Sequence, residues 1–293
     1  MRIIPGEIKT GELHSYLLGA VAPRPICFAS TVDKDGVPNL SPFSFFNVFG
    51  SNPTTLIFSP ARRVRDNTTK HTLQNIYETK EVVINVVNYA MVQQASLSSC
   101  EYPKGVDEFE KSGFTKMASE KVRPFRVAES PVQMECKVRE IIETGTEGGA
   151  GNLIICEVLV MHINDAILNE KNNIDPHKID LVARMGADFY CRASGGAVFE
   201  VVKPNTQLGI GVEALPESIR KSTVLTGNNL GQLGNVHEMP FVDPSFNDDK
   251  LKNIIQYYSI NPDDMDTELH CYAKELLDAG KVSEAWQVLL ADY

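Results

Sequence analysis

Short runs of β-forming residues, each ended by turn residues, fill the chain up to about residue 200. Residues 26–32 form one such run, and Asp35-Gly36 separates it from residues 37–41. Asp-Gly between two such runs predicts a hairpin, because glycine tolerates the positive φ of a tight turn. A short helix is expected over residues 70–79. Further strands are expected over residues 55–59 and 82–87.

Residues 132–139 alternate between apolar and polar side chains, which predicts a strand with one solvated face. The apolar set is Val132, Met134, Cys136 and Val138, and the polar set is Gln133, Glu135, Lys137 and Arg139. The Gly-rich segment 145–151 lacks the Gly-Lys-Ser/Thr of a phosphate-binding loop, so we interpret it as the hairpin turn before a strand at 153–163. Many short strands with few helices indicate a β-barrel or a sandwich.

Beyond residue 200 the apolar spacing becomes helical, so the chain divides into a domain at 1–200 and an extension at 201–293. Helices are expected at 215–220, 251–258, 269–277 and 282–290. Gly280 separates the last two, which form a helical hairpin. One such pair cannot bury both apolar faces, so we expect it to dock on the barrel or on another subunit. Residues 235–249 are the best linker candidate, and residues 226–231 are a turn or a small binding loop.

Composition describes a globular protein of 293 residues, with 43% hydrophobic and 23% charged residues. A net charge of −10 argues against a broad nucleic-acid-binding surface but leaves room for one local cationic pocket. The N-terminus lacks the apolar core of a signal peptide, and no apolar run is long enough to cross a bilayer. We therefore expect a cytoplasmic protein that binds neither nucleic acid nor membrane.

Metal and nucleophile chemistry have little support in the sequence. The six cysteines form no C-x-x-C pair and are expected to be thiols, several of them packed as small hydrophobes. No H-E-x-x-H, G-x-S-x-G or G-x-G-x-x-G motif occurs in the chain. His162, within an apolar strand, is expected to be a hydrogen-bonded core residue rather than a ligand.

The densest group of polar residues lies in the first third of the chain. Its members are Arg24, Ser30, Thr31, Asn39, Ser41, Ser44, Phe45, Phe46 and Asn47. Buried hydroxyls and amides need partners, which a ligand with many polar edges supplies. The alternative is an ordinary polar rim of loop and strand. Arg24 stands between two prolines that stiffen its backbone, which suits an anion or the edge of a flavin ring.

A second cluster, residues 62–72, collects three arginines and Lys70 immediately before the expected helix. Helix N-termini offer free N–H groups and a positive dipole end, and both favour phosphate. The alternative is a solvated loop that caps the helix with Thr or Asn.

These segments together resemble the flavin reductase-like, FMN-binding split-barrel family, which includes flavoredoxins. The matching blocks are 23–26, 30–33, 39–47, 70–76, 105–109, 128–132, 135–136, 151–152 and 184–186 with Tyr190. They follow one another in the family's order and cover most of residues 10–195. The family usually has Asp where this chain has His71, and a second Gly where it has Ala187.

The resemblance implies a mainly β fold, a six-stranded Greek-key split barrel followed by the helical C-terminal extension. It also implies a homodimer that binds FMN non-covalently near the subunit interface. Arg24, Ser30 and Thr31 would lie along the flavin, while Asn39, Ser41, Ser44, Phe45 and Phe46 would line the isoalloxazine and ribityl site. Asn47 would border it, and Lys70 and Thr72 would hold the phosphate.

The activity implied is an NAD(P)H-dependent flavin reductase, with hydride transfer to the flavin N5 and electrons passed to an acceptor protein or to free flavin. The cofactor carries this chemistry, so no catalytic acid or base side chain is required. One alternative is a flavoredoxin-like FMN electron carrier that a partner protein reduces. Another is a binding or regulatory protein that has kept the barrel and lost turnover.

Overall fold

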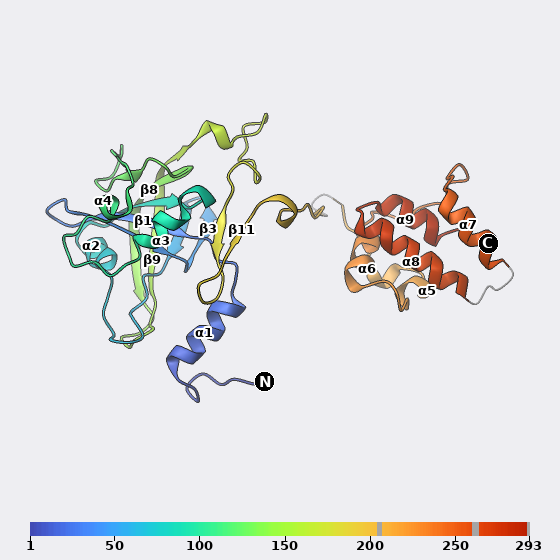
Figure 1. Ribbon diagram of the computed structural model, residues 1–293, viewed down its shortest axis with the longest axis horizontal. Coiled ribbons are helices and arrows are strands. Elements are labelled where there is room, and N and C mark those ends of the chain that lie inside the picture. The colour runs from blue at the N-terminus through green and yellow to red at the C-terminus, as the bar shows by residue number, and fades with distance from the viewer. Residues whose placement is uncertain (204–206, 260–263, 292–293) are drawn as a thin grey trace. The chain divides into compact units, whose positions relative to one another are not determined.

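The computed structural model describes residues 1–203, 207–259 and 264–291. The chain divides into two compact units, Met1–Phe199 and Glu200–Tyr293, each with its own elements and core (Figure 1). Unit 1 is mainly β, and unit 2 contains helices and no strand among its described residues.

Unit 1 is built on one antiparallel sheet with the strand order β2-β1-β5-β8-β9-β4-β3. The strands are β1 (Cys27–Val32), β2 (Pro38–Phe43), β3 (Phe46–Ser51), β4 (Thr54–Phe58), β5 (Glu81–Val86), β8 (Val132–Glu143) and β9 (Asn152–Ile163). The strands expected from the sequence are confirmed, as is the hairpin between β1 and β2. β3 was not predicted, and it makes seven strands where the resemblance implied six. β5 pairs with β1 and not with β4, the strand that precedes it in the sequence, as in Greek-key connections.

Smaller elements surround this sheet. The helices are α1 (Thr10–Ala20), α2 (His71–Thr79), α3 (Val92–Leu97) and α4 (Glu108–Ser112), with a 3₁₀ turn at Tyr89–Met91. Two short ribbons pair β6 (Lys116–Met117) with β7 (Arg126–Val127), and β10 (Val182–Arg184) with β11 (Tyr190–Arg192). At the turn of the second ribbon Ala187 adopts a φ of 50°, a left-handed conformation that favours the glycine usual in the family.

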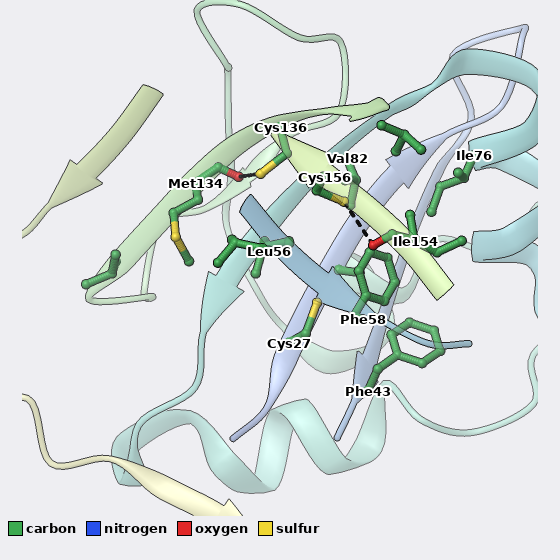
Figure 2. Close-up of a cluster of buried hydrophobic side chains, with 14 of the residues drawn as sticks. Cys27, Phe43, Leu56, Phe58, Ile76, Val82, Met134, Cys136, Ile154 and Cys156 are labelled. Atoms are coloured by element: carbon green, nitrogen blue, oxygen red, sulfur yellow. Dashed lines mark hydrogen bonds between the residues drawn. The ribbon is translucent and has the colours of Figure 1, made fainter. Parts of the chain in front are cut away.

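The barrel core lies on one face of the sheet and includes three cysteines (Figure 2). Cys27, Cys136 and Cys156 are fully buried among Phe58, Ile154 and other apolar side chains. Burial raises the pKa of each of these thiols well above its ordinary value. All six cysteines are free, so the prediction that several pack as small hydrophobes is confirmed.

The polar face of β8 corrects one expectation, because its first half is covered and not solvated. Gln133 and Glu135 are buried beneath residues 115–130. The Glu135 carboxylate accepts hydrogen bonds from the amides of Glu120 and Lys121 at 2.6–3.0 Å and lies 2.8 Å from His162 Nε2. His162 is thus hydrogen-bonded within the protein, as predicted. Alternation alone could not show that a distant segment returns over this face.

The described residues of unit 2 contain five α-helices, whose side chains pack in one core with Trp286. They are α5 (Glu217–Arg220), α6 (Gly227–Gly234), α7 (Asp249–Tyr258), α8 (Met265–Asp278) and α9 (Val282–Leu289). The predicted hairpin is confirmed as α8 and α9, with Gly280 at a φ of 73° between them. Side chains of α5, α6 and α7 pack against the hairpin in the same core, so the expectation that it needs the barrel or another subunit to cover it is wrong.

Residues 235–249 are not a linker, which corrects a second expectation. Their backbone bonds to α9, since the Asp243 amide donates to Gln287 at 2.7 Å and Gln287 donates to the Phe241 carbonyl at 3.0 Å. The boundary between the units falls at Phe199.

Thr226 begins α6 with a capping box, so residues 226–231, expected to be a turn or a small binding loop, form the start of a helix. No helix among the described residues is long and apolar enough to cross a membrane.

Candidate functional site

A cavity of about 270 Å³, here called the basic cavity, opens where β2 ends and α2 begins. Its walls come from α1, the β2–β3 connection, residues 59–64, the glycine turn and β10. The lining residues are His14, Leu18, Arg24, Pro42, Phe43, Ser44, Phe45, Ser59, Ala61, Arg62, Arg63, Val64, Lys70, Gly149 and Arg184. Cationic side chains therefore meet an apolar wall and two serine hydroxyls at one place.

Lys70 contributes a positive charge to the wall of the basic cavity. Its side chain is half-buried and forms no ion pair within 4 Å among the described residues. Burial and the nearby Arg63 charge lower the pKa of Lys70, and the same two causes lower that of His71. A desolvated cation beside further cations stabilises a bound anion. No side chain among the described residues caps α2, and the first amides of this helix, at the positive end of its dipole, directly follow Lys70.

The three arginines of this loop are engaged within the protein. Arg62 Nε donates a hydrogen bond to Asn67 Oδ1 at 2.6 Å. Arg63 pairs with Glu101 at 2.8 Å, and the same Glu101 carboxylate pairs with Arg65. Among the described residues of loop 62–70, Lys70 is thus the cation without a partner.

The glycine turn between β8 and β9 supports this loop from behind, which confirms it as a hairpin turn. The Gly149 amide donates to the Arg62 carbonyl at 3.0 Å. A Cβ atom at Gly148 would come within 3.0 Å of the Arg63 and Val64 carbonyl oxygens. Only a residue without a side chain allows this close approach.

Arg24 lines the basic cavity, yet most of its donors face the backbone. Its Nη1 bonds to the carbonyls of Leu18 and Val21 at 2.5 and 2.6 Å, and its Nη2 to that of Met185 at 2.8 Å. Nε, 3.4 Å from Ser44 Oγ, is the one donor directed toward the β2–β3 connection. Arg24 therefore ties the end of α1 and the β10–β11 turn to the barrel, and so holds two walls of the cavity in place.

Three other predicted residues, Thr31, Asn39 and Thr72, hold α2 on the β1–β2 hairpin together with Asn75. Thr31 and Asn39 are cross-strand partners. Asn75 Nδ2 donates to Thr31 Oγ1 at 3.1 Å, and Asn39 Nδ2 donates to Thr72 Oγ1 at 3.0 Å. These buried bonds fix the start of α2, and with it Lys70, relative to the sheet. The sequence reasoning missed Asn75, although its place three residues after Thr72 puts both on one helix face.

The remaining predicted residues divide between the cavity and the barrel. Ser44 and Phe45 line the basic cavity, and the Phe45 ring meets His14 edge-on at 6.1 Å. Phe46 packs against the barrel core, and Asn47 is exposed with its Oδ1 accepting from the Val48 amide. Ser30 and Ser41 are buried in β1 and β2, away from the lining. The structure thus gathers four of the eleven predicted residues around the basic cavity: Arg24, Ser44, Phe45 and Lys70.

A second cavity of about 320 Å³, the adjoining cavity, shares Pro42, Phe43, Ser44 and Arg184 with the basic cavity. Its other walls mix apolar and polar side chains from segments at or beside β1, β5, α3 and the β10–β11 ribbon: Ile26, Val87, Val92, Ala95, Ser96, Ser99, Asp188 and Tyr190. Ligand sites commonly combine such apolar walls with a few convergent polar groups. Arg184, at the junction of the two cavities, was noticed in the sequence only as part of a family block.

Comparison with known proteins shows which family has this architecture. A family model described as the flavin reductase like domain matches residues 19–176. An uncharacterized protein of Aquifex aeolicus is 35% identical over 69% of this chain and 100% of its own. Component B of nitrilotriacetate monooxygenase from Bacillus cereus has a TM-score of 0.63 and 27% identity, over 69% of this chain and 98% of its own. A split barrel domain protein from Shewanella frigidimarina has a TM-score of 0.58 and 25% identity, over 69% of this chain and 100% of its own.

Fold and site together define unit 1 as a split-barrel flavoprotein of the oxidoreductase class. The chain belongs to the flavin reductase-like family, whose model spans more than half of it. The matched residues end at 176, so unit 2 lies outside the family domain.

A phosphorylated flavin fits the residues present. Its phosphate needs a cation that the protein has not already neutralised, which Lys70 supplies. Its planar ring needs an apolar wall, which Phe43 and Phe45 supply, and its polar edges need donors such as Ser44. The two joined cavities have the size range of small-molecule sites.

Proposed function

We propose that this protein binds FMN non-covalently in the basic cavity and acts as an NAD(P)H-dependent flavin reductase. Held there by Lys70, Ser44 and Phe45, FMN would supply the redox chemistry, which is hydride acceptance at N5 from NAD(P)H and transfer of the electrons to an acceptor. The observation that carries the proposal is the unpaired, half-buried Lys70 at the start of an uncapped helix, beside an apolar wall.

The chain's own residues bind, orient and shield in this proposal. Lys70 holds the phosphate, assisted by the first amides of α2. Ser44 and Phe45 contact the flavin directly. Four further residues act indirectly, because their hydrogen bonds set the positions of the cavity walls: Arg24, Thr31, Asn39 and Thr72. No proton donor or acceptor side chain is assigned, since hydride transfer requires none.

We also propose that the protein is a homodimer, for a reason found in the sheet. Cross-strand partners share a face, and Met161 and Ile163 lie opposite Met134 and Val132 of the core. Yet Met161 is 46% and Ile163 37% exposed, and Val48 of β3, opposite a buried residue of β4, is 61% exposed. An exposed apolar surface that continues the core favours a second copy of the chain.

The test is an absorption spectrum of the purified protein, repeated after anaerobic addition of NADH or NADPH. A flavin spectrum that bleaches within the mixing time of a stopped-flow instrument supports the reductase. Flavin that bleaches only with a reduced partner protein supports the electron carrier instead. A protein that carries no flavin and takes up no added FMN refutes the proposal.

A further inference from the structure

A third cavity, of about 310 Å³, continues the adjoining cavity away from Lys70 and is here called the distal groove. Both are lined by Val92, Ser96, Asp188 and Tyr190, and the adjoining cavity shares four other residues with the basic cavity. The three cavities therefore lie next to one another in a row, here called the path. The rest of the distal groove is Tyr89, Gln93, Val182, Cys191 and Arg192. The distal groove shares no lining residue with the basic cavity, where FMN is proposed to bind, so it offers a surface for a second ligand.

Two tyrosine rings in the distal groove each carry an arginine stacked on one face. The Arg192 Cζ atom lies 3.7 Å from the centre of the Tyr89 ring, and the Arg184 Cζ atom lies 4.6 Å from that of Tyr190. Both rings remain partly exposed, Tyr89 by 50% and Tyr190 by 39%. Stacked planes of this kind bind a nucleobase, because every base offers a π-face to an aromatic ring or a guanidinium.

The charges along the path distinguish its two ends. Arg184, at the junction with the basic cavity, forms no ion pair within 4 Å among the described residues; its Nη2 donates to the Ala187 carbonyl at 2.8 Å. Arg192 is neutralised by a two-bond pair with Asp180, at 2.7 and 2.8 Å. Asp188 is exposed in the groove, and no arginine or lysine in the described part of the chain pairs with it.

We propose that the distal groove binds the adenosine half of a reduced nicotinamide dinucleotide and that it selects NADH over NADPH. The adenine stacks against Tyr89 and Tyr190, and Arg184 binds the pyrophosphate. Asp188 accepts hydrogen bonds from the ribose hydroxyls, the role that acidic residues take in sites specific for NAD. A 2′-phosphate in their place would face the Asp188 carboxylate, and Arg192 is already compensated by Asp180. This assignment rests on the reductase proposed above.

The direct test is equilibrium binding of ADP-ribose and of 2′-phospho-ADP-ribose to the full-length protein. Neither probe exchanges electrons, so their binding is independent of flavin reduction. We expect ADP-ribose to bind more tightly. Asp188→Asn should reduce the ratio of the two dissociation constants about two- to fivefold, which is the range for an exposed charge pair. Asp165→Asn is the matched control, because Asp165 is exposed in unit 1 and lies outside the cavities described above.

A second variant tests the stacking. Tyr89→Leu should weaken both probes about tenfold, within the range measured when a stacked base loses its aromatic partner. In turnover it should raise KM for NADH and leave kcat nearly unchanged, because the adenosine end contributes uniform binding. The Tyr89 amide, bonded to the Asp180 carbonyl at 2.9 Å, is retained in this variant.

The outcomes separate this inference from the reductase proposal. Rapid bleaching by NADH that ADP-ribose does not inhibit would overturn the distal groove and leave the reductase standing. ADP-ribose binding that depends on Tyr89, in a protein whose flavin no nucleotide bleaches, would overturn the reductase and keep the groove. Two results would overturn the selection of NADH by Asp188. One is equal affinity of the wild-type protein for both probes, and the other is an equal reduction of the affinity ratio in Asp165→Asn and Asp188→Asn.

Discussion

Replacing Lys70 with Met should separate cofactor binding from stability. The change removes the cation of loop 62–70 that has neither a hydrogen bond nor an ion pair among the described residues, and it keeps an unbranched side chain of similar length. A charge-assisted hydrogen bond to phosphate contributes about 1.5–3 kcal/mol. Since 1.4 kcal/mol corresponds to a factor of ten, the Kd for FMN should rise about ten- to a hundredfold. Riboflavin, which has no phosphate, should bind equally to both proteins.

Stability of the flavin-free protein should not fall in this variant. The pKa of Lys70 is lowered, so its charge is disfavoured in the folded state without a ligand, and removing that charge costs nothing. The advantage of FMN over riboflavin should likewise disappear as the pH rises through the Lys70 pKa, because the neutral amine no longer attracts phosphate.

Flavin fluorescence titration and thermal unfolding measure the two effects. Lys34→Met serves as the control, since Lys34 is exposed in the β1–β2 turn and lines none of the cavities described above. An equal loss of affinity for riboflavin and FMN would refute the assignment of Lys70 to the phosphate, and so would an unchanged Kd for FMN.

Four further predictions concern the structure around the site and the division of the chain. Arg24→Met leaves three carbonyls without their donor and should lower the free energy of unfolding of unit 1 by about 3 kcal/mol, measured by urea denaturation. Asn75→Leu should cost about 1–3 kcal/mol and weaken FMN binding together with stability, because it releases α2 from Thr31. For Glu135, burial opposes ionisation but hydrogen bonds from two amides and His162 outweigh it, so its pKa is lowered. Its stabilisation is present above the ordinary carboxyl pKa and is lost as the pH falls, so the difference in unfolding free energy between wild type and Glu135→Gln should shrink on acidification. Residues 1–199 alone should fold and retain the flavin, a result that visible absorption of the truncated protein checks.

Periodicity predicted most elements correctly, because spacing along the chain determines which side chains share a face. The period of two residues in 132–139 and the helical spacing after residue 250 both correspond to observed elements. β3 escaped prediction because its side chains are only partly buried, so no apolar alternation marks it. The core of unit 2 was underestimated for a related reason, since α5 and α6 are short and their contribution depends on contacts with α8 and α9.

The candidate site was predicted as residue types and blocks, but their roles depend on tertiary contacts. Arg24 and Thr72 looked alike from the sequence as ligand-binding groups. In the structure Arg24 lines the basic cavity but directs most of its donors to backbone carbonyls, and Thr72 accepts a hydrogen bond from Asn39 outside the lining. Lys70 and Ser44 also line the cavity.

The sequence by itself determined the strand and helix periods, the two-part division of the chain, the cationic loop before α2 and the membership of a flavin-binding family. These follow from local spacing and from blocks of adjacent residues. Only the tertiary structure decided which cations are neutralised, which polar face of β8 is covered, and that Arg184 and Tyr190 extend the cavity away from Lys70. Hydrogen-bond partners more than a hundred residues apart, such as Arg24 and Met185, depend on how the sheet brings them together.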